Sequence, residues 1–156
     1  MQVEFTDKDT GEKKQHDAPG LTSTILGAIA DLDFSKEQVK ATIDQLDISA
    51  DAKSTIYILA DVTIKVGSAI VKIGRKILDI IIGFFNQHPN IGFGAIFGAF
   101  IGFLFSLVPF FGQLLGPIVI PVFTAYGMVL GAKEELKDKE LERKIRMSAA
   151  QFEQFS

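Results

Sequence analysis

The chain has 156 residues and a net charge of −3, with 16 basic and 19 acidic side chains and no cysteine. The lack of cysteine excludes disulfides, thiolate nucleophiles and cysteine-bound metals. The charge is uneven, because residues 1–53 hold 11 acidic against 6 basic side chains and residues 80–132 hold no formal charge. The acidic start argues against nucleic-acid binding. The uncharged block also differs from an ordinary surface helix, in which charged and apolar residues alternate between two faces.

This uneven composition predicts four parts. They are an acidic head over residues 1–53, an amphipathic helix over 54–87, a transmembrane helical hairpin over 88–132 and a charged helical tail over 133–156. The start of the chain lacks the basic and then apolar run of a signal peptide, so we expect the head to stay on the side where it is made.

The head begins with two short segments, QVEF and KKQ, on either side of the turn-forming triplet DTG at residues 9–11. This pattern is typical of a short hairpin, with a disordered start as the alternative. Two short helices are predicted at about residues 21–32 and 36–46. The second begins with a capping-box pattern formed by Ser35 and Gln38.

A long helix is predicted next, since no proline interrupts residues 50–85 and polar side chains recur there at spacings of three and four. They form one narrow, mostly basic stripe: Asp61, Lys65, Ser68, Lys72, Arg75, Lys76 and Asp79. Three interpretations stay open. The helix lies in the bilayer interface with its stripe on anionic head groups, packs inside a helical bundle, or lines a water-filled pore.

Two membrane crossings are predicted at about residues 90–108 and 113–132, because each segment is apolar and close to the 20 residues or so that span a bilayer. Basic residues flank the pair on both outer sides, and the tip between the crossings has no charge. Both termini are therefore expected in the cytoplasm, with the chain in the cell inner (plasma) membrane. A re-entrant hairpin is the alternative to a spanning one.

The first crossing carries a small residue at every fourth position: Gly94, Gly98, Gly102 and Ser106. The second crossing adds Gly127 and Gly131. Small residues let helix backbones approach closely in lipid, so this glycine face predicts a tight partner helix. The partner is either the second arm of the same hairpin or another subunit of a homo-oligomer.

Phenylalanines surround the same crossing, at Phe97, Phe100, Phe103 and Phe105. We expect them to face lipid or to form a hydrophobic gate. No nucleophile and base stand at a recognisable spacing, and the two histidines have no ligand-spaced neighbours. The sequence therefore predicts no catalytic residue, no metal site, no cofactor and no enzymatic activity.

Together these features predict an all-α integral membrane protein with a small acidic cytosolic head. Its plan resembles the membrane-inserting part of helical pore formers such as colicins, in architecture and over about residues 55–132. The leading hypothesis is a homo-oligomeric pore in contact with anionic lipid. The alternatives are a membrane anchor that recruits a cytosolic protein through its head or tail, and a membrane-shaping protein.

Overall fold

The computed structural model describes residues 1–128 and 136–156. In these ranges the chain forms helices and strands, so the expected all-α fold is wrong. The strands are β1 (Gln2–Thr6), β2 (Lys13–Asp17), β3 (Ile64–Val66) and β4 (Ala69–Val71). The α-helices are α1 (Ser23–Ala30), α2 (Lys36–Asp44), α3 (Ala50–Ala60), α4 (Ile73–Gln87), α5 (Phe93–Leu107), α6 (Pro109–Ala125) and α7 (Lys139–Ala150). Two 3-10 helices are η1 (Pro89–Ile91) and η2 (Gln151–Phe155).

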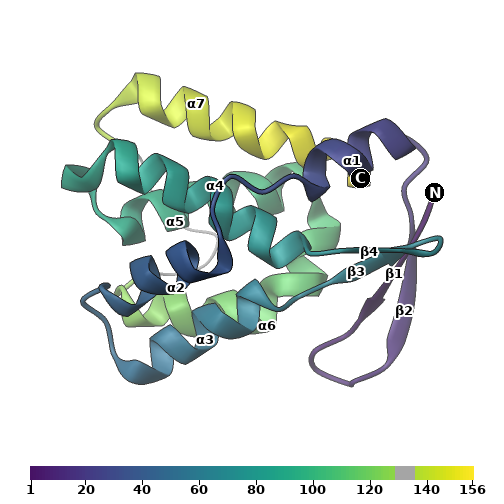
Figure 1. Cartoon of the computed structure of the whole chain (residues 1–156), viewed down its shortest axis with the longest axis horizontal. Coiled ribbons are helices and arrows are strands. Elements are labelled where there is room, and N and C mark those ends of the chain that lie inside the picture. The colour runs from purple at the N-terminus through teal and green to yellow at the C-terminus, as the bar shows by residue number, and fades with distance from the viewer. Residues whose placement is uncertain (129–135) are drawn as a thin grey trace.

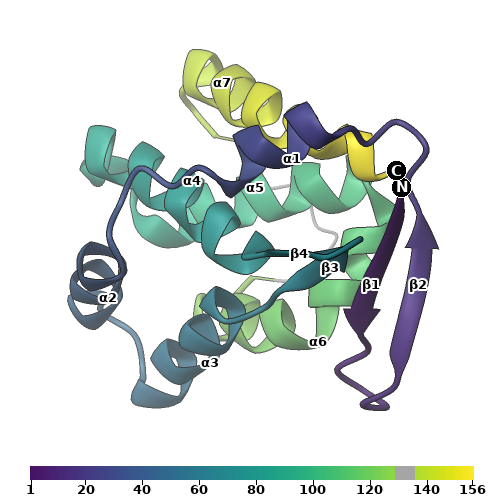
Figure 2. The same cartoon turned by 45° about the vertical axis from the view of Figure 1, so that its right-hand side comes forward.

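The strands make one antiparallel sheet in the order β2-β1-β3-β4, which lies at one end of the molecule beside the helices (Figure 1). β1 joins two hairpins that are far apart in the sequence, because it pairs with β2 along its whole length and with β3 at Val3↔Val66. The alternating residues Val3 and Phe5 are buried, so one face of β1 contributes to the core. The two termini lie near each other beside this sheet (Figure 2).

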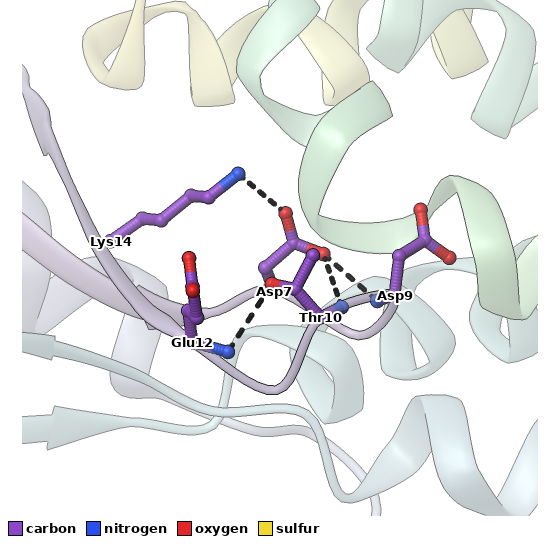
Figure 3. A network of polar contacts seen from close by, with 5 residues as sticks. All are labelled: Asp7, Asp9, Thr10, Glu12 and Lys14. Atoms are coloured by element: carbon purple, nitrogen blue, oxygen red, sulfur yellow. Dashed lines mark hydrogen bonds and ion pairs between the residues drawn. The ribbon is translucent and has the colours of Figure 1, made fainter.

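Residues 2–17 form the hairpin and not the disordered alternative. The Asp7 carboxylate organises its turn by accepting hydrogen bonds from the backbone N–H groups of Asp9 (2.8 Å) and Thr10 (3.3 Å) (Figure 3). The Lys14 ammonium lies 2.7 Å from the other Asp7 oxygen, and this contact lowers the pKa of Asp7 below its usual value. The triplet DTG is therefore turn structure within a polar network.

Helix α5 is the centre of the helical layer and packs against α4, α6 and α7, while α3 packs against α6. Its aromatic side chains Phe97 and Phe100 are fully buried, as is Phe111 of α6. The chain's last helical turn closes this core, since the ring of Phe152 meets that of Phe111 edge-on at 5.8 Å. The buried apolar residues from Val3 to Phe155 form one continuous cluster.

The predicted transmembrane hairpin is wrong, because none of the helices in residues 1–128 and 136–156 is both long and apolar enough to cross a membrane. α5 has 15 residues and α6 has 17, which correspond to about 22 and 25 Å against a hydrocarbon core of about 30 Å. The chain bends at Val108, because Pro109 disfavours helical conformation at the residue before it. Helix α6 then begins at Pro109, without a loop between the two helices.

The physical reason is that apolar side chains all round a helix indicate burial, and protein can bury them as well as lipid. Here the amphipathic helices α3, α4 and α7 surround the α5–α6 pair. Three hypotheses depended on these membrane crossings: the pore, the membrane anchor and the membrane-shaping protein. They are wrong because none of the helices described is both long and apolar enough to cross a membrane. The predicted inner-membrane location with cytoplasmic termini is wrong for the same reason.

The predicted single helix over residues 50–85 is also wrong, because it divides into α3, the β3–β4 hairpin and α4. Residues 62–66 read VTIKV, in which Val62, Ile64 and Val66 are buried and the residues between them are exposed. This period of two belongs to a half-buried strand. Gly67 then adopts a φ of +62° in a two-residue turn, which a helix does not allow.

Candidate functional site

A hollow of about 430 Å³ lies where α2, α3, the start of β3 and the N-terminus of α4 meet. These three helices contact one another at this corner of the molecule (Figure 1). We call this hollow the basic hollow because four of its lining residues are cationic. Its lining residues are Lys36, Val39, Lys40, Tyr57, Ala60, Asp61, Thr63, Lys72 and Arg75.

The local sequence sets the α2 wall of the basic hollow. The predicted capping box is confirmed, because Ser35 Oγ accepts a hydrogen bond from the Gln38 N–H and Gln38 Oε1 accepts one from the Ser35 N–H. This start orients α2 so that Val39 is buried against the core. Lys36 and Lys40, one helical turn apart, then stand at the rim of the basic hollow.

The opposite wall depends on a close approach between α3 and α4. Gly74 is in the first turn of α4, and a Cβ added there would lie 1.8 Å from the carbonyl oxygen of Leu59. The Gly74 N–H donates to the carbonyl of Val62 at 3.1 Å. This glycine therefore lets Lys72 and Arg75, which flank it, stand close to the end of α3.

The charge of the basic hollow is opposite to that of the whole chain. Four cations face one carboxylate, Asp61, in the lining, whereas the chain carries −3 overall. In the part of the chain that the structure describes, no salt bridge involves Lys36, Lys40, Lys72 or Arg75. The positive charge gathered here is therefore available to an anion.

Arg75 is half-buried and has two different polar environments. Its Nη2 donates to the carbonyl of Phe34 at 2.9 Å, which holds the guanidinium in place. Its Nε is buried and, among the described residues, has no hydrogen-bond partner. The bond to Phe34 therefore holds the guanidinium at the wall of the basic hollow, where its planar set of N–H donors suits a carboxylate or phosphate group.

Tyr57 supplies a hydroxyl at the same rim. Its phenol donates a hydrogen bond to the Asp44 carboxylate, and this bond raises the pKa of Tyr57 to about 12. The Lys53 ammonium donates to the Asp44 carbonyl at 2.8 Å, which ties the end of α2 to α3. The tyrosine is therefore a fixed, protonated group at neutral pH.

Arg75 also takes part in a clamp that fastens the α1–α2 connection to α4. The Asp79 carboxylate, only 1% exposed, accepts hydrogen bonds from the N–H groups of Asp33 (3.0 Å) and Phe34 (2.8 Å). The Lys76 ammonium donates to the carbonyl of Asp31 at 2.7 Å. This clamp fixes the residues that lead into α2 and so positions the lysines of the basic hollow.

The predicted polar stripe is thus divided among three places. Asp61, Lys72 and Arg75 line the basic hollow, and Lys76 and Asp79 belong to the clamp. Lys65 is on β3, and Ser68 is the second residue of the turn after it. The stripe is not one helix face, because α3 ends at Ala60.

The glycine face is also divided. Gly94 and Gly98 are buried, whereas Gly102 and Ser106 are exposed. A Cβ added at Gly94 would lie 2.5 Å from Cδ1 of Tyr126. The close partner at that end is therefore a residue of the same chain.

The remaining small residues of the second predicted crossing do not extend this face. Gly127 follows α6 with a φ of +69°, a conformation that favours glycine. Gly131 lies outside the described residues.

The predicted phenylalanines of α5 differ in environment. Phe97 and Phe100 are fully buried inside the protein. Phe103 and Phe105 are half-buried. The Arg146 guanidinium of α7 lies 4.9 Å from the centre of the Phe103 ring, so this ring takes part in a cation–π contact.

Six residues of the basic hollow were absent from the sequence-based prediction: Lys36, Val39, Lys40, Tyr57, Ala60 and Thr63. The spacing of Lys36 and Lys40 places both on one helix face, but nothing in the spacing says that this face meets α4. Among the described residues, no group of three histidine or carboxylate side chains is placed to hold a metal ion. The prediction of no metal site stays a prediction.

Comparison of this chain with protein-family models, with curated proteins and with solved structures gives no match.

Proposed function

We propose that the basic hollow binds a small anionic ligand through its phosphate or carboxylate groups. The observation that carries this proposal is the convergence of four cations, without salt bridges among the described residues, on one hollow of an acidic chain. Its volume of about 430 Å³ lies within the range of small-molecule sites.

The lining indicates how such a ligand is held. Arg75 contributes a preorganised guanidinium, and Lys36, Lys40 and Lys72 contribute ammonium groups on flexible stems. Val39 and Ala60 supply a small apolar wall. The Asp61 carboxylate favours a ligand that carries a hydrogen-bond donor beside its anionic group.

Binding rather than catalysis is part of this proposal. The lining combines cations, hydroxyls and one carboxylate. The Tyr57 hydroxyl donates to the Asp44 carboxylate, and because this bond raises the pKa of the phenol to about 12, the phenol is protonated at neutral pH. The predicted partners, which are anionic lipid head groups, a second copy of the chain and a cytosolic protein, stay predictions, as does the expected absence of nucleic-acid binding.

Isothermal titration calorimetry with pyrophosphate and with citrate, at low ionic strength, tests the proposal. We expect one of these anions to bind the wild type, and Lys40→Gln or Lys72→Gln to weaken binding about tenfold through the loss of one charge-assisted contact. Lys8→Gln is the matched control, because it removes the same charge from an exposed residue of the β1–β2 turn.

Two results contradict the proposal. One is that the wild type binds neither anion. The other is that Lys40→Gln and Lys72→Gln bind as tightly as Lys8→Gln, because the anion then responds only to net charge.

A further inference from the structure

A second, smaller hollow of about 180 Å³ lies on the outer face of the sheet and adjoins the basic hollow. We call it the sheet hollow. Its lining residues are Glu4, Phe5, Thr6, Lys13, Thr63, Ile64, Lys65 and Ile70. Thr63 lines both hollows, so their surfaces meet at that residue.

The alternation of β3 explains this continuity. Val62 and Ile64 are buried, and Thr63 and Lys65 between and after them are exposed. Successive side chains of a strand point to opposite faces. The exposed side of this extended segment therefore leads from Thr63, just before β3 and at the basic hollow, to Lys65 on the open sheet face.

The sheet hollow adds an apolar contact to the charges. Ile70 is directly opposite Lys65 in the β3–β4 ladder and is 71% exposed, the largest exposed fraction among the large apolar side chains described. Lys65 takes part in no salt bridge among the described residues, whereas Lys13 lies 3.7 Å from the Glu4 carboxylate. The surface thus offers a cation and an isoleucine side by side, at the end away from the basic hollow.

This mixture distinguishes one class of ligand from others. A uniformly charged polyanion, such as polyphosphate or a nucleic-acid strand, would meet the carboxylates of Asp61 and Glu4 along the same path and would leave Ile70 in water. An extended peptide with acidic residues on either side of an apolar one complements both the cations and the isoleucine.

We propose that the two hollows form one binding track for an acidic peptide segment. Its carboxylates contact Lys40, Lys72 and Arg75 in the basic hollow. Its apolar side chain covers Ile70, and a further carboxylate contacts Lys65. This inference rests on the proposed anion site and assigns its ligand class.

Selection from a library of short random peptides displayed on phage, with the full chain as bait, tests the inference. The enriched peptides are then made with a fluorescein label, and their affinity is measured by fluorescence anisotropy. We expect enrichment of peptides with acidic residues around an apolar one. We expect Lys40→Gln to weaken their binding about tenfold, and Lys65→Gln and Ile70→Ser to weaken it about fivefold.

The controls are matched to each change. Lys8→Gln controls for the charge of Lys65→Gln. Ile120→Ser controls for Ile70→Ser, because Ile120 is 49% exposed on α6 and lines neither hollow. Circular dichroism verifies that each variant is folded.

The outcomes separate this inference from the proposed function. If enriched peptides depend on Lys40 but bind Ile70→Ser and Lys65→Gln as tightly as the controls, the track is wrong and the anion site stands. If pyrophosphate or citrate binds in a Lys40-dependent manner but no acidic peptide is enriched, the peptide class is wrong. If neither anions nor peptides bind, both proposals are wrong.

Discussion

The α5–α6 pair and the corner formed by α2, α3 and α4 differ in the polarity of their side chains. α5 and α6 carry no formal charge, and their inward-facing residues pack apolar rings such as Phe97, Phe100 and Phe111 into the centre of the protein. The corner instead combines a buried carboxylate, Asp79, with cations around a hollow. We conclude that the first region supplies stability and that the second combines polar contacts that hold it together with charges that are left available.

The largest change in the free energy of unfolding is expected from a cavity in the apolar core of the α5–α6 pair. Phe111→Ala removes a fully buried ring that contacts Phe110, Phe152 and Phe155. We expect this cavity to lower the free energy of unfolding by about 3–5 kcal/mol, measured by urea denaturation. A cost within the range of a surface substitution would contradict the placement of this ring in the core.

The next effect concerns the clamp of the corner. Asp79→Asn replaces one of two acceptor oxygens by an amide N–H group that faces a backbone N–H. We expect a loss of about 1–3 kcal/mol in the free energy of unfolding, together with weaker anion binding because α2 is displaced. Asp33→Asn, at an exposed position nearby, is the control and should leave both quantities nearly unchanged.

Two glycines of the same helix should respond with opposite signs. Gly94→Ala places a methyl group against the Tyr126 ring, whereas a Cβ at Gly102 meets no atom within 4 Å. We expect Gly94→Ala to cost about 1–3 kcal/mol through overpacking, and Gly102→Ala to stabilise by up to about 1 kcal/mol because alanine favours helix. Thermal unfolding measures both, and equal responses would argue against an internal partner for Gly94.

The two tyrosines differ in what raises their pKa, and this difference can be measured without a large change in stability. The pKa is raised to about 12 for both, for Tyr57 through its bond to Asp44 and for Tyr126 through burial. Because the folded pKa is above the usual value of 10, the stabilising contribution of Tyr57 is complete below pH 10 and is lost as the pH rises towards 12.

Asp44→Asn should therefore return the pKa of Tyr57 towards 10 and leave that of Tyr126 raised. Ultraviolet titration of phenolate absorbance measures this, with Tyr57→Phe to assign the transition. An unchanged titration in Asp44→Asn would show that Asp44 does not control this phenol.

Part of the fold could be predicted from the sequence because its signal is local. The capping box of Ser35 and Gln38 and the turn of the first hairpin depend on neighbouring residues, and both are present. The segment that contains β3, residues 62–66, also had a local signal in its buried Val62, Ile64 and Val66. That alternation did not decide the prediction, because the polar residues of the same region also fit the spacings of three and four of a helix.

The remainder depended on tertiary placement. The lack of charge in residues 80–132 indicates burial, but the apolar side chains of Phe97 and Phe100 have the same preference for lipid and for a protein core. Likewise Lys36 and Lys40 become part of a site only because the clamp holds α2 against α4. Neither fact can be read from periodicity.

Anion binding in the basic hollow is tested most directly by an amide chemical-shift titration of the isotope-labelled chain with pyrophosphate. We expect chemical-shift changes at the start of α2, in Tyr57 to Thr63 and in the first turn of α4, with small changes in the amides of α5 and α6. Shifts that cluster elsewhere, or no shifts when the anion is in large excess, would contradict the assignment of the basic hollow as a binding site.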